Sequence, residues 1–173
     1  MGSGPDNGTG PSGLVFTPLF RNGLTLALAV LVIDQTTKWW IVFTVMQPPR
    51  VIPVTPFFNL VMGWNRGVSF GMLDSESSAT AWILSLVALA ISAALGVWLY
   101  RSDRLRVALG IGLVIGGAVG NVVDRVRWGA VADFLDLHWA GYHWPAFNVA
   151  DSAITVGAAV LILDSLFVRE KKR

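Results

Sequence analysis

The stretch SSATAWILSLVALAISAALGVWLY, residues 77–100, decides the fold class. It runs for 24 residues between Glu76 and Arg101 without one charged side chain. At about 1.5 Å per helical residue it reaches about 36 Å, which is enough to cross the hydrocarbon core of a bilayer with some tilt. The core of a soluble protein scatters its charges more closely, so these residues predict a transmembrane helix.

The composition of the whole chain agrees with a membrane protein. Of its 173 residues, 54% are hydrophobic and only 14% are charged, whereas about 25% are charged in soluble globular proteins. This composition argues against a soluble enzyme and against disordered or collagen-like chains. The chain has no cysteine, which removes disulfides, thiol nucleophiles and cysteine-ligated metals from consideration.

Three further apolar stretches accompany the first. We predict four membrane spans, at about residues 22–46, 79–100, 107–123 and 152–168. In the third span, Gly112, Gly116 and Gly120 recur every four residues and predict a smooth stripe for close helix contact. We therefore expect a membrane all-α bundle in which residues 21–168 form a single four-helix domain.

The two ends of the chain differ from this domain. Residues 1–20 are rich in Gly, Pro and Ser, and they predict a disordered cytoplasmic lead whose first part resembles the scar of an expression tag. Residues 169–173 predict a short basic cytoplasmic tail.

The basic residues predict the orientation in the membrane, because Lys and Arg favour the cytoplasmic ends of spans. One side of the predicted bundle holds eight of them: Arg21, Arg101, Arg104, Arg106, Arg169, Lys171, Lys172 and Arg173. The other side holds four: Arg50, Arg66, Arg125 and Arg127. We expect both termini in the cytoplasm, and residues 47–78 and 124–151 outside it. Basic residues at span ends are better explained by topology than by nucleic-acid binding.

The two outer segments have different patterns. Residues 58–64 alternate apolar and small or polar side chains, and a turn at 65–67 precedes Val68-Ser69-Phe70, so we predict a small extracytoplasmic β-hairpin on the membrane surface. The second outer segment predicts an aromatic-rich extracytoplasmic loop at headgroup level. Its aromatic and related residues are Trp128, Trp139, Tyr142, His143, Trp144, Pro145 and Phe147. We expect a loop or interfacial role for His138 and His143 rather than metal binding.

Three aspartates are predicted to meet at the outer ends of the third and fourth spans: Asp124, Asp133 and Asp151. Asp133 lies in the apolar run VADF, where desolvation raises the pKa of an unpaired carboxyl. Asp151 precedes an apolar helix, whose N-terminal amides favour its charged form. Two such carboxylates form an acid and base pair that can activate water, as in aspartic proteases, and we prefer Asp133 as the acid.

Other interpretations of the charged residues stay open at this point. Each of the three aspartates can instead be a helix cap, a salt-bridge partner or a solvated loop charge, and Arg125 is a natural partner for Asp124. Asp34 and Lys38 share a helix face in the first span, either as a structural ion pair or as support for the outer site. No Gly-rich phosphate loop and no Gly-x-Ser-x-Gly elbow occurs in the sequence.

A small proton- or ion-coupled membrane transporter is the alternative function. It would use Asp34, Lys38 and the outer carboxylates as an ion path. The clustering of acids at one interface, rather than through the midplane, and the lack of a repeated half argue against it. A noncatalytic assembly subunit is a third possibility, which the glycine stripe favours.

Five short motifs in this order resemble the bacterial lipoprotein signal peptidases, also called signal peptidase II. They are Asp34-Gln-Thr-Thr-Lys38, Trp64-Asn65-Arg66-Gly67-Val68-Ser69-Phe70, Gly116-Gly117-Ala-Val-Gly120-Asn121-Val-Val-Asp124-Arg125, Val131-Ala-Asp133-Phe134 and Phe147-Asn148-Val-Ala-Asp151-Ser152. The resemblance covers about residues 25–165. It implies four transmembrane helices with both ends cytoplasmic, a small extracytoplasmic β-cradle and a loop that closes over the site. It also implies cleavage of diacylglyceryl-modified prolipoproteins just before the lipidated cysteine, in the bacterial plasma (inner) membrane.

The resemblance assigns roles to individual residues. The catalytic aspartates of the family fall on Asp133 and Asp151, which agrees with the pair chosen from their surroundings. The residues that line or brace the site are Asn65, Asn121, Arg125 and Asn148, and those that support it are Asp34, Lys38, Asp124, Gly116 and Gly120. Val68-Ser69 stand where many members have Ala-Ala. We expect lipid-modified prolipoproteins and membrane lipids as partners, with no metal, no other cofactor, no nucleic acid and no required oligomer.

Overall fold

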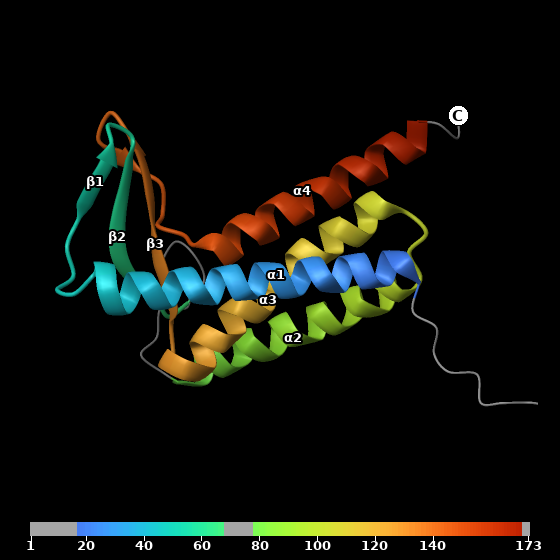
Figure 1. Ribbon diagram of the computed structural model, residues 1–173, viewed down its shortest axis with the longest axis horizontal. Helices are drawn as coiled ribbons and strands as arrows, with labels where there is room; N and C mark the ends of the chain where they lie inside the picture. Colours follow the sequence, from blue (N-terminus) through green and yellow to red (C-terminus); the bar gives the residue numbers. More distant parts are fainter. Residues whose placement is uncertain (1–16, 68–77, 171–173) are drawn as a thin grey trace, which may run out of the picture.

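The computed structural model describes residues 17–67 and 78–170 (Figure 1). Four long helices in this part of the chain are long and apolar enough to cross a membrane. They are α1 (Pro18–Trp40, continued by the π-helical turn η1, Ile41–Val45), α2 (Ser78–Tyr100), α3 (Leu105–Trp128) and α4 (Val149–Glu170). The four predicted spans are confirmed, although most run a few residues longer than expected. Helix α1 begins inside the predicted disordered lead, where Thr17 caps it by accepting a hydrogen bond from the Phe20 N–H at 3.1 Å.

Helix α3 lies at the centre of the bundle and contacts each of the other three helices. The predicted glycine stripe faces α1, because a Cβ on Gly116 would lie 2.5 Å from the carbonyl oxygen of Ala27. Gly117 faces the other way, against the backbone of Ala150 at the start of α4. Small residues on two sides of α3 therefore let both neighbours approach at backbone distance.

A small antiparallel sheet stands at one end of the bundle (Figure 1). Its strands lie in chain order: β1 (Ile52–Thr55), β2 (Phe58–Asn65), β3 (Val131–Trp139) and β4 (Tyr142–His143). Strand β2 pairs with β1 on one side and β3 on the other. The predicted hairpin arm at 68–70, with the Val68-Ser69 departure, lies outside the described residues.

Strand β3 occupies a segment that the sequence predicts as part of an aromatic loop. Residues 131–134 are all buried, so they form a continuous apolar run around Asp133 instead of the alternation that marks a half-exposed strand. The aromatic tip of the segment is a tight hairpin, in which Ala140 and Gly141 both adopt positive φ angles, of 50° and 84°.

A hydrophobic cluster packs the sheet against the bundle. Phe134 of β3 is 3% exposed and packs with Ile41 and Met46, which are 2% and 1% exposed. The wide turn η1 brings these two residues together, since the Met46 N–H donates to the Ile41 carbonyl at 2.9 Å. This contact places β3 directly beside the ends of the helices that carry the charged residues.

The opposite end of the bundle holds the start of α1, the α2–α3 connection and the end of α4 (Figure 1). There Arg104, the N-cap residue of α3, forms an ion pair with Asp164 of α4. The described members of the basic set therefore lie at the end away from the sheet: Arg21, Arg101, Arg104, Arg106 and Arg169.

Candidate active site

Asp151 lies in the first turn of α4 and is held there by a capping box. The side chain of Asn148, just before the helix, accepts a hydrogen bond from the Asp151 N–H at 2.9 Å. In return, Asp151 Oδ2 accepts a hydrogen bond from the Asn148 N–H at 3.3 Å. This reciprocal pairing satisfies two otherwise unpaired helix amides and fixes the direction of the carboxylate.

The same asparagine joins Asp151 to Asp133 of β3. Asn148 is fully buried, and its Nδ2 donates to Asp133 Oδ1 at 2.7 Å. Asn148 thus contacts both aspartates. Its side-chain Nδ2 binds Asp133, and its main-chain N–H and side-chain oxygen bind Asp151. Asp133 and Asp151, 18 positions apart in sequence, are therefore held as a pair of carboxylates by the buried Asn148.

The surroundings of Asp133 favour its protonated form. The residue is 4% exposed, and burial, followed by the nearby charge of Asp151, raises the pKa of its carboxyl to about 7. Hydrogen bonds from Asn65 Nδ2, at 3.1 Å, and Asn148 offset part of this rise. Asp133 is buried, as the apolar VADF run predicts.

Asn121 of α3 provides a second amide donor to the pair. Its Nδ2 donates to Asp151 Oδ1 at 2.8 Å, while its Oδ1 accepts from Lys38 Nζ at 3.0 Å. Because an ammonium group can only donate, Lys38 fixes which end of the amide faces Asp151.

Lys38 is the centre of a buried ion triad beneath the two carboxylates. Its Nζ lies 2.9 Å from Asp34 Oδ2 and 2.8 Å from Asp124 Oδ2, and the side chains of all three are 0% exposed. The expected Asp34–Lys38 pair is present. The direct ion pair of Asp124 is with Lys38, whereas Arg125, which was expected to help neutralise it, acts on it only through its charge.

The two acids of the triad each hold the backbone next to one candidate catalytic residue. Asp34 Oδ1 accepts from the Ala150 N–H at 2.9 Å, directly before Asp151. Asp124 Oδ2 accepts from the Ala132 N–H at 3.2 Å, directly before Asp133. The triad therefore links the starts of α4 and β3 through a single cation, and Asp124 belongs to this support and not to the carboxylate pair.

Gln35 is part of this network and was missed in the sequence. Its Nε2 lies within hydrogen-bond distance of Asp124 Oδ1 at 2.8 Å, of Asp34 Oδ2 at 3.2 Å and of the Gly120 carbonyl at 3.2 Å. A Cβ on Gly120 would lie 2.6 Å from Asp34 Oδ2, so the glycine makes room for the triad. An uncharged amide within an apolar span is the signal that points to such a residue.

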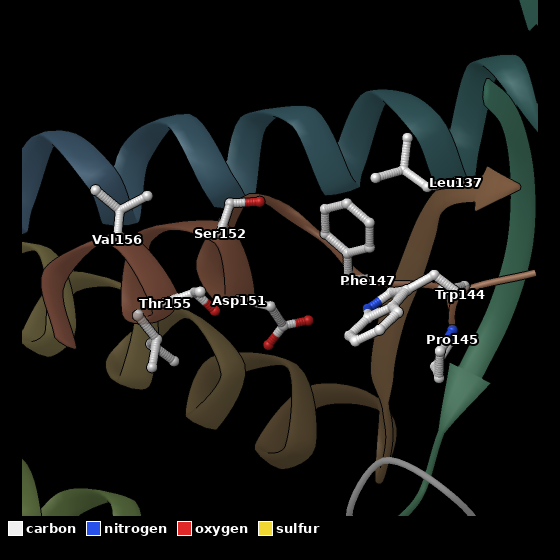
Figure 2. Close-up of a pocket in the computed structure, with 10 residues that line it drawn as sticks. Leu137, Trp144, Pro145, Phe147, Asp151, Ser152, Thr155 and Val156 are labelled. Atoms are coloured by element: carbon white, nitrogen blue, oxygen red, sulfur yellow. The ribbon is translucent and has the colours of Figure 1, made fainter. Parts of the chain in front are cut away.

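Two cavities are lined by candidate site residues: Asp151 lines one, and Asn121 and Arg125 line the other. The larger, about 550 Å³, lies between α4 and residues 144–147 and is lined mainly by apolar groups such as Leu137, Phe147 and Ile154. Figure 2 shows the Asp151 carboxylate between the α4 residues of this cavity and Trp144 and Phe147. A long apolar chain fits such a lining.

The smaller cavity, of about 290 Å³, opens between α2, α3 and α4. Arg125 and Asn121 line it together with aliphatic side chains. The Nε of Arg125 is buried and has no hydrogen-bond partner within the described residues. A guanidinium donor without a protein partner is available to a carbonyl or phosphate oxygen of a bound molecule.

Four membrane-length helices with a pair of carboxylates at one end, one buried and one half-buried, are the arrangement of a membrane-embedded aspartic peptidase. A family model described as signal peptidase (SPase) II matches residues 26–167. The chain belongs to the signal peptidase II family and is an aspartic endopeptidase.

Individual relatives extend over most of the chain. A lipoprotein signal peptidase of Methylorubrum extorquens (strain PA1) is 44% identical over 151 residues, covering 85% of this chain and 86% of that protein. One from Nitrobacter hamburgensis is 42% identical over 154 residues, covering 86% and 93%. A bacterial membrane enzyme solved by the in meso method at 2.3 Å has a TM-score of 0.77 and 32% identity, covering 88% of this chain and 92% of that one.

Proposed function

We propose that this protein removes signal peptides from diacylglyceryl-modified prolipoproteins by cleaving just before the lipidated cysteine. Its relatives are named lipoprotein signal peptidases and match over most of their length. The observation that carries the chemical part of the proposal is the linkage of Asp133 and Asp151 through the buried side chain of Asn148.

In the proposed reaction, the two aspartates move protons while water attacks the scissile carbonyl. Ionised Asp151 takes a proton from the water, and protonated Asp133 donates its proton to the carbonyl oxygen. The resulting tetrahedral diol collapses when Asp151 gives the proton to the amide nitrogen and Asp133 recovers one from the hydroxyl. The carbon–nitrogen bond breaks, leaving a carboxyl end on the signal peptide and an amine on the cysteine. The raised pKa of Asp133 supports its assignment as the acid.

Asn65, Asn121, Asn148 and Arg125 brace the reacting groups in this proposal. The three amides hold the carboxylates in fixed directions. Arg125 has a buried Nε without a hydrogen-bond partner in the described part of the chain, and it is suited to bind an oxygen of the substrate. Lys38, Asp34 and Asp124 act one step further away, because they anchor the backbone before each aspartate.

The cavities suggest how the substrate lies. The apolar cavity beside Asp151 suits an acyl chain or the apolar end of a signal peptide. Substrate that is anchored in the bilayer then presents its peptide bond at the level of the outer helix ends. We place the protein in the bacterial plasma membrane as a multi-pass chain with both termini cytoplasmic and the site at the extracytoplasmic face, which the eight-to-four distribution of basic residues supports. Residues 21–168 are the peptidase unit in this proposal.

The decisive experiment incubates the purified protein with a diacylglyceryl-modified prolipoprotein and locates the cut by mass spectrometry. We expect one new N-terminus, at the lipidated cysteine, and no cleavage of the same precursor without its lipid. The matched control is Asp151→Asn, which keeps the size of the side chain and should abolish the product. Cleavage at another bond, or wild-type turnover by the control, would refute the proposal.

A further inference from the structure

A strip of aromatic side chains surrounds one arginine on the α1 and α3 side of the bundle, at the end that carries the sheet. The aromatic strip consists of Trp39, Phe43, Trp64, Arg127 and Trp128. Its members are in sequential contact: the Trp39 and Phe43 ring centroids lie 5.5 Å apart, and those of Trp64 and Trp128 lie 5.3 Å apart. The Arg127 guanidinium joins these two pairs, at 5.9 Å from the Phe43 ring and 4.9 Å from that of Trp128.

The aromatic strip is exposed although it is made of large rings. Trp39 is 54% exposed, and Phe43 and Trp64 are each 45% exposed. Trp128 is the last residue of α3, and Phe43 lies in η1, so the strip sits where two apolar spans end. Exposed tryptophans at this depth are typical of the headgroup region of a bilayer.

Arg127 has a hydrogen-bonding capacity that no carboxylate among the described residues uses. In the described part of the chain it makes cation–π contacts and no ion pair with a carboxylate. Stacking occupies the faces of a guanidinium group, whereas its N–H donors lie in its plane and point outward. The group that best matches these donors is a doubly coordinating anion such as a phosphate.

We propose that the aromatic strip binds the phosphate of one outer-leaflet phospholipid. Arg127 holds the phosphodiester oxygens, and the rings of Phe43, Trp64 and Trp128 pack against the glycerol and upper acyl chains. The bound lipid fixes the end of α3 and strand β2 at one depth in the membrane. Since Trp64 directly precedes Asn65, this contact sets the height of the carboxylate pair relative to the bilayer surface. The binding site is separate from the proposed catalytic groups.

Native mass spectrometry of the delipidated protein in a non-ionic detergent tests the proposal. Phosphatidylglycerol is titrated against wild type, Arg127→Gln and Arg50→Gln. Arg50 is the matched control, because it is an exposed arginine at the same end of the molecule without a ring contact in the described residues. We expect the tightest lipid-binding event to weaken by about tenfold or more in Arg127→Gln and by less than about twofold in the control.

Two further titrations distinguish binding of a phospholipid from binding of other ligands. A monoglycosyl diacylglycerol with the same acyl chains should bind equally to wild type and Arg127→Gln, because it has no phosphate. Inorganic phosphate in about tenfold excess should leave the phospholipid bound, since the rings contribute to lipid binding. Equal phosphatidylglycerol affinity in wild type and Arg127→Gln, or complete displacement by inorganic phosphate, would overturn the proposal. If Arg127→Gln does not fold, Arg127→Lys and Trp128→Leu replace it, and unchanged affinity in both would overturn it equally.

Discussion

Asp133 and Asp136 lie three residues apart on β3 and are similarly buried, at 4% and 6% exposed. The pKa values of the two carboxyls nevertheless shift in opposite directions from the ordinary value of an aspartate. Burial and the charge of Asp151 raise the pKa of Asp133 to about 7. Burial acts on Asp136 too, but hydrogen bonds from His143 and Asn59 outweigh it and lower the pKa of that carboxyl below its ordinary value.

The difference arises from what each face of the strand meets. Residues an odd number of positions apart point to opposite sides of a sheet. Asp133 meets two neutral amides and another carboxylate, whereas Asp136 lies 2.9 Å from His143 Nδ1 and accepts from Asn59 Nδ2 at 2.8 Å. Burial alone therefore does not make a catalytic acid. Among the described residues, a second carboxylate within range and the lack of a basic side chain in direct contact distinguish Asp133, the proposed acid.

The largest effect on kcat is expected when Asp133 and Asp136 are each replaced by asparagine in separate variants. Asp133→Asn should reduce kcat by about a thousandfold or more, because the proposed acid is lost. Asp136→Asn should keep turnover within about twofold and lower the free energy of unfolding by about 1 kcal/mol, since its partner His143 is partly exposed. Prolipoprotein cleavage and thermal unfolding measure the two quantities. A comparable loss of turnover in both variants would contradict the contrast between the faces.

A smaller loss is expected from the buried cation behind the pair. Lys38→Met leaves Asp34 and Asp124 uncompensated and should destabilise the protein by about 3–5 kcal/mol, with kcat reduced by about a hundredfold. Combining it with Asp124→Asn removes one of the two buried charges and should restore much of the stability. Turnover should stay low in the combined variant, because Asn121 is no longer oriented by an ammonium group. Full recovery of kcat together with stability would show that Lys38 is only a structural residue.

The sequence predicts the spans and the two principal aspartates because their signals are local. An uncharged run of membrane length can be recognised without knowing the fold, and so can an aspartate inside VADF or at the start of an apolar helix. The Asp34–Lys38 pair is equally local, since its members are one helical turn apart.

The remaining features depend on contacts between distant segments. Strand β3 shows no alternation because both of its faces are covered where Asp133 lies. The bond from Ala150 to Asp34 joins residues 116 positions apart, and the one from Gln35 to Asp124 joins residues 89 positions apart. Neither partner carries a pattern that identifies the other. The assignment of Asp124 to the triad follows only from the packing of α1 against α3.

The pH dependence provides a finer test of Asp133. Its proposed role requires the protonated form, so kcat should fall as the pH rises through about 7, the raised pKa of this carboxyl. The hydrogen bond from Asn65 lowers that pKa, because it stabilises the ionised form. In Asn65→Ala, the fall of kcat with rising pH should therefore occur at a higher pH, by about half a unit to one unit. Asp136→Asn is the control and should leave the pH at which kcat falls unchanged. A shift of this pH to a lower value in Asn65→Ala would contradict the assignment of Asp133 as the acid.

The smallest effect is expected from a single methyl group next to Asp34. In Gly120→Ala the new Cβ would lie 2.6 Å from Asp34 Oδ2, so the carboxylate must move away from the bonds that it makes to Lys38 and Ala150. We expect a stability loss of about 1–3 kcal/mol and a roughly tenfold lower kcat, since the start of α4 shifts with Asp151. Gly96→Ala in α2 is the matched control, because a Cβ there meets nothing within 4 Å. That variant should gain about 0.5–1 kcal/mol from the higher helix propensity of alanine. Asp136 should be unaffected in both variants, because neither glycine contacts it. A changed pKa of Asp136, measured by NMR in Gly120→Ala, would show that the two faces of β3 are coupled.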